Sequence, residues 1–382
     1  MFDQHLDPGA DGSLDARSLP THGGVYLLAD TDDRPILLAS CENLRRAVSN
    51  RLAAPPPEHK TKRAALAPIA RHVHWRSTFS RFETAWAHWQ EARALDPKNY
   101  RDVIAFPPAW FLIADPVARV PRILPVREFK TDTDRRIGPF ATRRDAETWL
   151  HILEDVFDLC RYDHILERTP NGEPCAYFEM GKCPAPCDGT LSIEAYRRMI
   201  ADAMDFSAGI REPRLSTLRE AVRTASDRLE FEKAAAMQQS INRATELVAK
   251  PVYAHMCDLH ECCWLVVQRA SPRSRSAKAT MVRPFHVHDG VMEVGAPVAL
   301  ADLGIAAEGW LSRCGALPIS PPASQEERTA RCETLWLLAK FLFQGNRAPG
   351  LFHRSDRLPD GDAFVQAVRE RFAGGAPNHV KP

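Results

Sequence analysis

The stretch EPCAYFEMGKCPAPC, residues 173–187, places three cysteines within fifteen positions. A fourth cysteine, Cys160, lies a short way upstream in DLCRYD. Only three residues separate Cys183 from Cys187, and two of them are prolines, which exclude a regular helix. The segment is therefore expected to form a rigid turn that aims two sulfurs at one centre.

Four neighbouring thiols are independent buried side chains, halves of disulfides, or ligands of a metal. The N-terminus, MFDQHLDPGADGSLDAR, is acidic and polar and does not read as a secretory signal. We therefore expect a cytoplasmic chain, in which disulfides are rare. Thiolates suit tetrahedral zinc or a [4Fe-4S] cluster, and the spacing leaves both open. We predict that Cys160, Cys175, Cys183 and Cys187 hold one metal centre.

The composition is that of an ordinary globular protein. The 382 residues are 26% charged and 45% hydrophobic, which predicts two to four domains. The net charge of +1 means that any surface for nucleic acid is local. No apolar run approaches the roughly 18 residues needed to span a bilayer, so we expect no membrane partner.

The periodicity along the chain predicts an α+β protein. Residues 19–52 read as strand, turn, strand and helix, and residues 81–95 as a helix that ends before Pro97. Residues 214–248 contain neither glycine nor proline and predict one or two antiparallel helices. The tail after Gly345 is expected to fray. We predict four parts: an α/β module at 1–102, a cysteine-rich connector at 103–210, a helical hairpin at 211–250, and an α+β module at 251–382.

Several segments together resemble UvrC, the nuclease subunit of bacterial nucleotide excision repair. PCAYFEMGKCPAPCDG is similar to its cysteine segment, and LREAVRTASDRLEFEKAAAMQQSI to its UVR motif. GGVYLLADTDDRPILLASCENLRRAVSNRL resembles the opening of a GIY-YIG nuclease domain, and RRIGPFATRRDAETWLHILEDVFDLC the segment that joins these parts. The resemblance covers about residues 20–250, is weaker after 250, and implies that the family's RNase H-like domain is missing.

The resemblance implies a [4Fe-4S] cluster on the four cysteines, with Zn²⁺ as the alternative. It also implies a nuclease site in the N-terminal module, which can be compared residue by residue. Tyr26 matches the family's first tyrosine. The remaining catalytic positions carry other chemistry: Leu37, Leu38 and Ala39 replace the second tyrosine motif, Ala47 the arginine, and His88 the metal-binding glutamate.

Two residues lie close enough in sequence to substitute for the lost groups. Arg51 follows Ala47 by one helical turn, and Glu91 follows His88 by three residues. His88 is itself a possible metal ligand. We nevertheless expect a nuclease fold without activity, in which Tyr26 still lies near His88. The alternative is an endonuclease with a rearranged site that uses Mg²⁺ or Mn²⁺.

The resemblance to the UVR motif implies that the hairpin docks a UvrB-like helicase subunit. Phe231 matches the family's aromatic position and is the expected anchor, beside Leu229, Glu232 and Ala235. We expect this apolar stripe to be partly exposed in the isolated chain. The alternative is that it packs against the chain's own core.

Three basic stretches, at 60–63, 134–144 and 269–278, are candidates for contact with DNA phosphates. Together these features predict an accessory protein of DNA repair that binds DNA and a UvrB-like subunit without cleaving. The alternatives are the active endonuclease and a redox or iron-responsive regulator that uses the cluster.

Overall fold

The computed structural model describes residues 2–10, 12–53, 66–115, 117–127, 135–256, 258–272, 279–316 and 320–373. Three antiparallel sheets and fourteen helices of one turn or more lie in this part of the chain, which confirms the α+β class. The basic stretch at 60–63 and most of the one at 269–278 lie outside the described residues. Among the described helices, none is long and apolar enough to cross a membrane.

The N-terminal module is a four-stranded sheet with a helix on each face. Its strands are β1 (Gln4–Leu6), β2 (Gly24–Ala29), β3 (Pro35–Cys41) and β4 (His72–Ser77), in the order β1-β4-β2-β3. The helices are α1 (Leu44–Leu52), α2 (Arg81–Leu95) and the short α3 (Tyr100–Val103). The predicted strand–turn–strand–helix is confirmed, and α2 ends before Pro97. Strand β4 was missed because its sequence, HVHWRS, is largely polar.

The middle part has a small sheet covered by helices. Strands β5 (Trp110–Ala114), β6 (Ile123–Val126) and β7 (Arg135–Phe140) follow the order β6-β5-β7. Helices α4 (Arg143–Phe157) and α7 (Ile193–Ser207) pack against them. The one-turn helices α5 (Asp163–Leu166) and α6 (Ala176–Glu179) come between α4 and α7 along the chain. Buried Trp149 donates its Nε1 hydrogen to Ser207 Oγ at 2.9 Å, which fixes α4 against α7.

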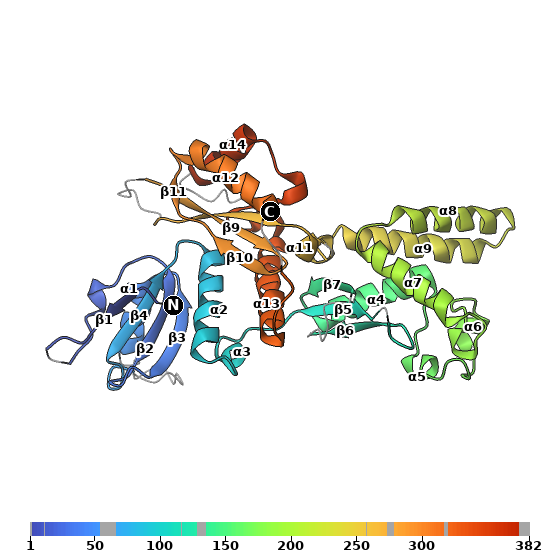
Figure 1. Ribbon diagram of the computed structural model, residues 1–382, viewed down its shortest axis with the longest axis horizontal. Coiled ribbons are helices and arrows are strands. Elements are labelled where there is room, and N and C mark those ends of the chain that lie inside the picture. The colour runs from blue at the N-terminus through green and yellow to red at the C-terminus, as the bar shows by residue number, and fades with distance from the viewer. Residues whose placement is uncertain are drawn as a thin grey trace.

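The predicted hairpin consists of α8 (Glu212–Asp227) and α9 (Phe231–Val248). Its base joins the core of the middle part through the apolar side chains of Leu215, Leu218, Ile241 and Leu247. Figure 1 shows its other end projecting away from the rest of the molecule. The short helices α10 (Pro251–Ala254) and α11 (Asp258–Glu261) lead into the last module.

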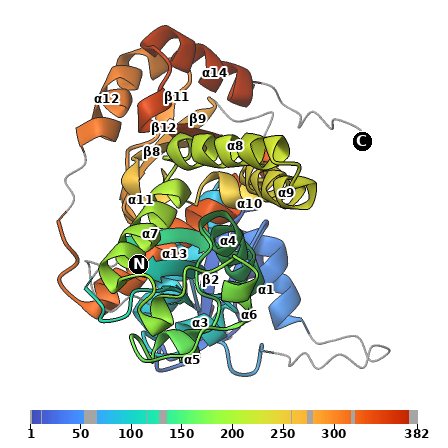
Figure 2. The same ribbon diagram turned by 90° about the vertical axis from the view of Figure 1, so that its right-hand side faces the viewer.

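The C-terminal module is a five-stranded sheet with helices on both faces. Its strands are β8 (Trp264–Arg269), β9 (Met281–His288), β10 (Val291–Val294), β11 (Val298–Ala299) and β12 (Leu351–Arg354). Its helices are α12 (Leu303–Ala316), α13 (Gln325–Leu342) and α14 (Gly361–Ala373). Figure 2 shows α12 and α14 at the end of the molecule away from α5 and α6.

The expectation of a frayed tail after Gly345 was wrong for residues up to 373. Strand β12 pairs with β8, and α14 buries Phe364, Val368 and Phe372 against α12 and the sheet. The polar appearance of the segment hid three apolar side chains at helical spacing.

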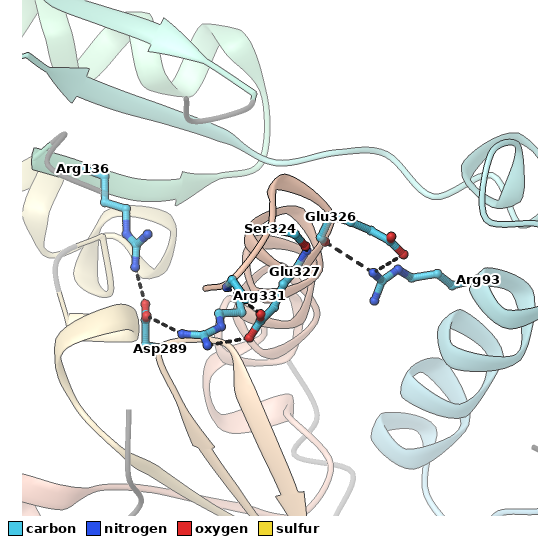
Figure 3. A network of polar contacts seen from close by, with 8 residues as sticks. Arg93, Arg136, Asp289, Ser324, Glu326, Glu327 and Arg331 are labelled. Carbon is cyan, nitrogen blue, oxygen red and sulfur yellow. Dashed lines mark hydrogen bonds and ion pairs between the residues drawn. The ribbon is translucent and has the colours of Figure 1, made fainter. Parts of the chain in front are cut away.

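Helix α13 joins the three modules. Buried Glu333 accepts hydrogen bonds from Trp89 Nε1 at 2.8 Å, Tyr100 OH at 2.6 Å and Arg101 Nε at 2.6 Å, which attaches the N-terminal module. On its other side Asp289 pairs with Arg136 of β7 and with Arg331 of α13 (Figure 3). Partly buried polar contacts therefore join the modules, together with the apolar core that α2, β9 and α13 share.

Candidate functional site

The cysteine segment lies at the end of the middle part that is remote from its sheet. Cys160 follows α4, Cys175 immediately precedes α6, and Cys183 and Cys187 lie in the turn before α7. As predicted, the segment between the last two is not a regular helix: Ala185 adopts a left-handed conformation with φ of 50°, and Pro186 begins a 3-10 turn. The backbone N–H of Cys160 donates a hydrogen bond to Tyr196 OH at 3.1 Å.

The thiols interact with one another unequally. Interaction with the Cys160 thiol lowers the pKa of Cys183 to about 7. The same contact raises the pKa of Cys160 above its ordinary value. Burial raises the pKa of Cys187, with smaller contributions from the charges of Asp188 and Cys183.

Sequence reasoning missed Arg161 beside this group. Its guanidinium lies over the Tyr177 ring, 4.6 Å from the centroid, and pairs with Asp155 at 2.7 Å. Its positive charge further lowers the pKa of Cys183. The dipeptide Arg-Tyr directly after Cys160 in DLCRYD was the available signal, because a cation next to a thiol favours the thiolate.

The residue type of these donors, four cysteine thiols, suits a thiolate-bound metal. The geometry is incomplete. Within the described ranges no three His, Cys, Asp or Glu side chains already surround a point where a metal ion would bind. Metal binding by the four cysteines therefore stays a prediction.

Tyr26 lies in β2, the central strand of the N-terminal sheet, and only 2% of its surface is exposed. It is paired with Ala39 on β3 and Trp75 on β4. Residues directly opposite in antiparallel strands point to the same face, and the Tyr26 face packs against Leu44 and Val48 of α1. Arg51, in the last turn of α1, is half-buried.

His88 and Glu91 lie on α2, which covers the other face. Glu91 is 2% exposed, and its Oε1 lies 3.7 Å from Nη1 of Arg76. Arg76 is paired with Val25, the neighbour of Tyr26, and successive strand residues point to opposite faces. Burial lowers the pKa of His88, and its buried Nε2 meets no hydrogen-bond partner among the described residues.

The expectation that Tyr26 lies near His88 was therefore wrong. The sheet separates Tyr26 and Arg51 from His88 and Glu91, so these four candidate catalytic residues do not form one site. Sequence reasoning missed Arg76, which uses Glu91 as a buried ion-pair partner. The sequence of β4, which is rich in histidine, did not indicate that Arg76 would pair with Glu91.

The tip of the α8–α9 hairpin carries exposed apolar residues. Leu229 is 73% exposed and Phe231 is 63% exposed, which confirms the predicted exposure of the Phe231 stripe. Glu232 and Ala235 are also exposed on the same first turns of α9. Leu229 has a φ of 60°, a left-handed conformation that is unfavourable for a branched residue.

Three arginines of the basic stretch at 134–144 form ion pairs within the protein. Arg135 pairs with Asp205, Arg136 with Asp289, and Arg143 with Glu147 at 2.7 Å. Arg269, from the third stretch, donates to the backbone oxygen of Phe372 at 2.9 Å. These arginines therefore have structural partners, and contact with DNA phosphates stays a prediction.

Comparison with known proteins gives one matching family and many relatives. Residues 109–206 match the model of the UvrC/Cho excinuclease, middle domain. The UvrABC system protein C of Kocuria rhizophila is 26% identical over 356 residues, which span 90% of this chain and 50% of that protein. Its counterpart in Salinispora arenicola is 28% identical over 280 residues, 72% of this chain and 40% of that protein.

The protein of the same name from Corynebacterium jeikeium is 29% identical over 238 residues, 59% of this chain and 34% of that protein. The chain thus spans about half or less of the length of these relatives. No solved structure matches it. The matched middle domain includes Cys160, Cys175, Cys183 and Cys187, so the cysteine segment lies inside the region of family similarity.

Proposed function

Because this chain belongs to the UvrC family, we propose that it is a non-catalytic component of nucleotide excision repair that binds a UvrB-like helicase subunit through the tip of the α8–α9 hairpin. The exposed tip is the observation that carries this proposal. Leu229 and Phe231 leave most of their apolar surface in water at the far end of a projecting element.

The local conformation supports a role for the tip in binding. The backbone of Leu229 takes the left-handed conformation that ends α8, where Glu230 N donates to Ala225 O at 2.9 Å, while its exposed side chain does not pack in the core. Residues held in sparsely populated conformations concentrate at functional sites. Glu230 pairs with Lys233 at 3.3 Å beside Phe231, which provides a charged rim around an apolar centre, as in protein interfaces.

The N-terminal module supports the non-catalytic part of the proposal. Metal-dependent phosphodiester cleavage needs a metal ligand, a group at the nucleophile and a cation around one phosphate. Here Tyr26 and Glu91 lie on opposite sides of a sheet, and Glu91 is engaged with Arg76. We propose that the module serves as a platform and not as a nuclease.

DNA contact is proposed to occur through phosphates without sequence preference. The middle part offers Arg127 and Arg143 at the Trp110 ring, 4.7 and 5.6 Å from its centroid. Such binding falls steeply with salt because counterions are released from DNA.

Calorimetric titration of the full chain with UvrB tests the partner. We expect Phe231→Ala to weaken the complex by about 2 kcal/mol, roughly thirtyfold, because buried aromatic side chains dominate interfaces. The matched control is Ile305→Ala, which removes an 89% exposed apolar residue from α12 and should leave the affinity unchanged. If wild type and Phe231→Ala bind UvrB with equal affinity, the hairpin tip is ruled out as the docking site.

The same preparations, with and without UvrB, are assayed for nicking of damaged duplex in Mg²⁺ or Mn²⁺. We expect no cleavage. Nicking that is lost in Tyr26→Phe or Glu91→Gln would instead establish an endonuclease with a rearranged site.

A further inference from the structure

A small cleft lies where the three modules meet. Among the described residues that line it, three are cationic, Arg101, Arg127 and Arg328, and one is anionic, Glu333. Arg101 belongs to α3 of the N-terminal module, Arg127 directly follows β6 of the middle part, and Arg328 lies near the start of α13 in the C-terminal module. Each module thus contributes one arginine to a cleft with an excess of positive charge.

Contacts within the protein hold two of these arginines at the cleft. Nε of Arg101 donates to Oε1 of buried Glu333 at 2.6 Å. Nη1 of Arg328 donates to Oε1 of Gln325, one turn earlier on α13, at 3.0 Å. A guanidinium that is fixed in this way loses little side-chain entropy when it binds a ligand.

The third arginine is held by an aromatic ring. The guanidinium of Arg127 lies over Trp110, 4.7 Å from the ring centroid, and among the described residues it makes no hydrogen bond or ion pair. Stacking on a ring leaves the in-plane N–H groups of a guanidinium able to donate to an anion.

The size of the cleft restricts its ligand. Its volume is about 10 Å³, which is roughly the space that one water molecule needs. An oxygen atom of a phosphate fits such a space, whereas a nucleobase is too large. Arginine forks also match phosphate oxygens in charge and geometry. The lining and the size together favour a phosphate whose body stays outside the cleft.

We propose that this cleft binds a phosphate of the DNA backbone, and that Arg101, Arg127 and Arg328 share its oxygens and so connect the three modules through the ligand. The inference rests on the proposed DNA contact and gives that contact a place. It also implies that DNA is bound by the assembled molecule and not by one module alone.

The surface beside the cleft favours DNA over a free anion. Arg143, which pairs with Glu147, lies 5.6 Å from the centroid of the same Trp110 ring that Arg127 covers. Basic side chains therefore continue beyond the cleft along the middle part. A small anion would fill the cleft only, whereas a DNA strand also reaches this neighbouring arginine.

Fluorescence anisotropy of a labelled duplex, titrated with the full chain over a series of salt concentrations, tests the site. We expect Arg127→Gln and Arg328→Gln each to weaken binding by about tenfold at low salt, for every duplex sequence. Each should also lower the slope of log K against log salt by about one, because one phosphate contact is lost. Arg127→Lys retains the charge and should restore most of the slope. Arg101 is left unchanged, since its loss would leave buried Glu333 without this partner.

Arg357→Gln is the matched control. It removes the same charge from a side chain that is 77% exposed beside β12 of the C-terminal module, and it should leave the slope unchanged. Urea unfolding of each variant verifies that the fold is retained. Calorimetric titration of the wild type with inorganic phosphate separates the two sources of the ligand, and we expect no saturable binding at millimolar phosphate.

An unchanged salt slope in either Arg127→Gln or Arg328→Gln, with a wild type that binds duplex, would overturn the inference and place the proposed DNA contact elsewhere. Inorganic phosphate that binds the wild type but not these variants, without loss of their duplex affinity, would assign the cleft to a free anion. A wild type that does not bind duplex would remove the proposed DNA contact together with this site. None of these results affects the titration with UvrB, which tests the proposed partner separately.

Discussion

At the scale of single residues, the N-terminal module retains polar groups in its interior without a catalytic arrangement. His88 illustrates this, because its side chain is half-buried and its buried Nε2 has no hydrogen-bond partner among the described residues. Burial lowers the pKa of His88 below the ordinary value of 6.5, so the folded protein favours the neutral imidazole. A residue of this kind makes stability depend on pH.

We predict that stability falls in acid partly because of His88. Well above pH 6.5 the imidazole is largely neutral in both states. As the pH falls below that value the unfolded chain takes up the proton first, so the free energy of unfolding decreases. His88→Gln should reduce this loss between about pH 7.5 and 5.5, measured by urea unfolding.

The reduction will be partial, because burial also lowers the pKa values of His286 and His353. Exposed His164 offers the control substitution, His164→Gln. A pH dependence of His88→Gln equal to that of the wild type would show that the buried imidazole does not titrate as described.

At the scale of elements, the α8–α9 hairpin has two regions with different tasks. Its base contributes Ile241 and Ala244 to the core of the middle part, while its tip exposes Leu229 and Phe231. A two-helix hairpin has little core of its own, so its stability depends on the contact of α9 with α4. The tip is thus free to change without loss of the fold.

We predict that substitutions in the two regions separate stability from binding. Ile241→Ala should lower the free energy of unfolding by about 3 kcal/mol, because it leaves a cavity at a site that is 5% exposed. Phe231→Ala should change it by less than about 0.5 kcal/mol, as is usual for surface positions. Denaturant unfolding of both variants measures the difference. A large loss in Phe231→Ala would place that ring in the core and contradict its exposure.

At the scale of the whole molecule, the β9–β10 hairpin holds the modules together through its turn. Asp289 of this turn pairs with Arg136 of the middle part, and Arg331 of α13 bonds Glu327 at 2.7 Å (Figure 3). The neighbouring Glu326 pairs with Arg93 of the N-terminal module at 3.0 Å. Contacts from three modules therefore meet along the first two turns of α13.

We predict that Gly290→Ala disrupts this junction. Gly290 has a φ of +74°, and a Cβ there would overlap the backbone carbonyl of Arg331. Gly345→Ala is the matched control, because Gly345 has a φ of +55° with open space around it. Thermal and urea unfolding should show Gly290→Ala to be less stable than the control by about 2 kcal/mol, the cost of overpacking. Equal losses of stability in the two variants would mean that the added methyl group at position 290 does not disturb the packing of the turn against α13.

The sequence by itself determined several local elements and the clustering of four cysteines between residues 160 and 187. Periodicity sufficed for the α8–α9 hairpin, because helices with one apolar face repeat their pattern every three to four residues. Asp289 and Gly290 suit the tight turn between β9 and β10, since both adopt positive φ. The exposure of Phe231 followed from a hairpin with more apolar residues than its own core can bury.

Tertiary structure alone decided which distant residues meet. The pairing register places Tyr26 and Glu91 on opposite faces, and register depends on strand β4, whose polar sequence concealed it. The tail became strand β12 and helix α14 because β8 and α12 offer partners that lie far away in sequence.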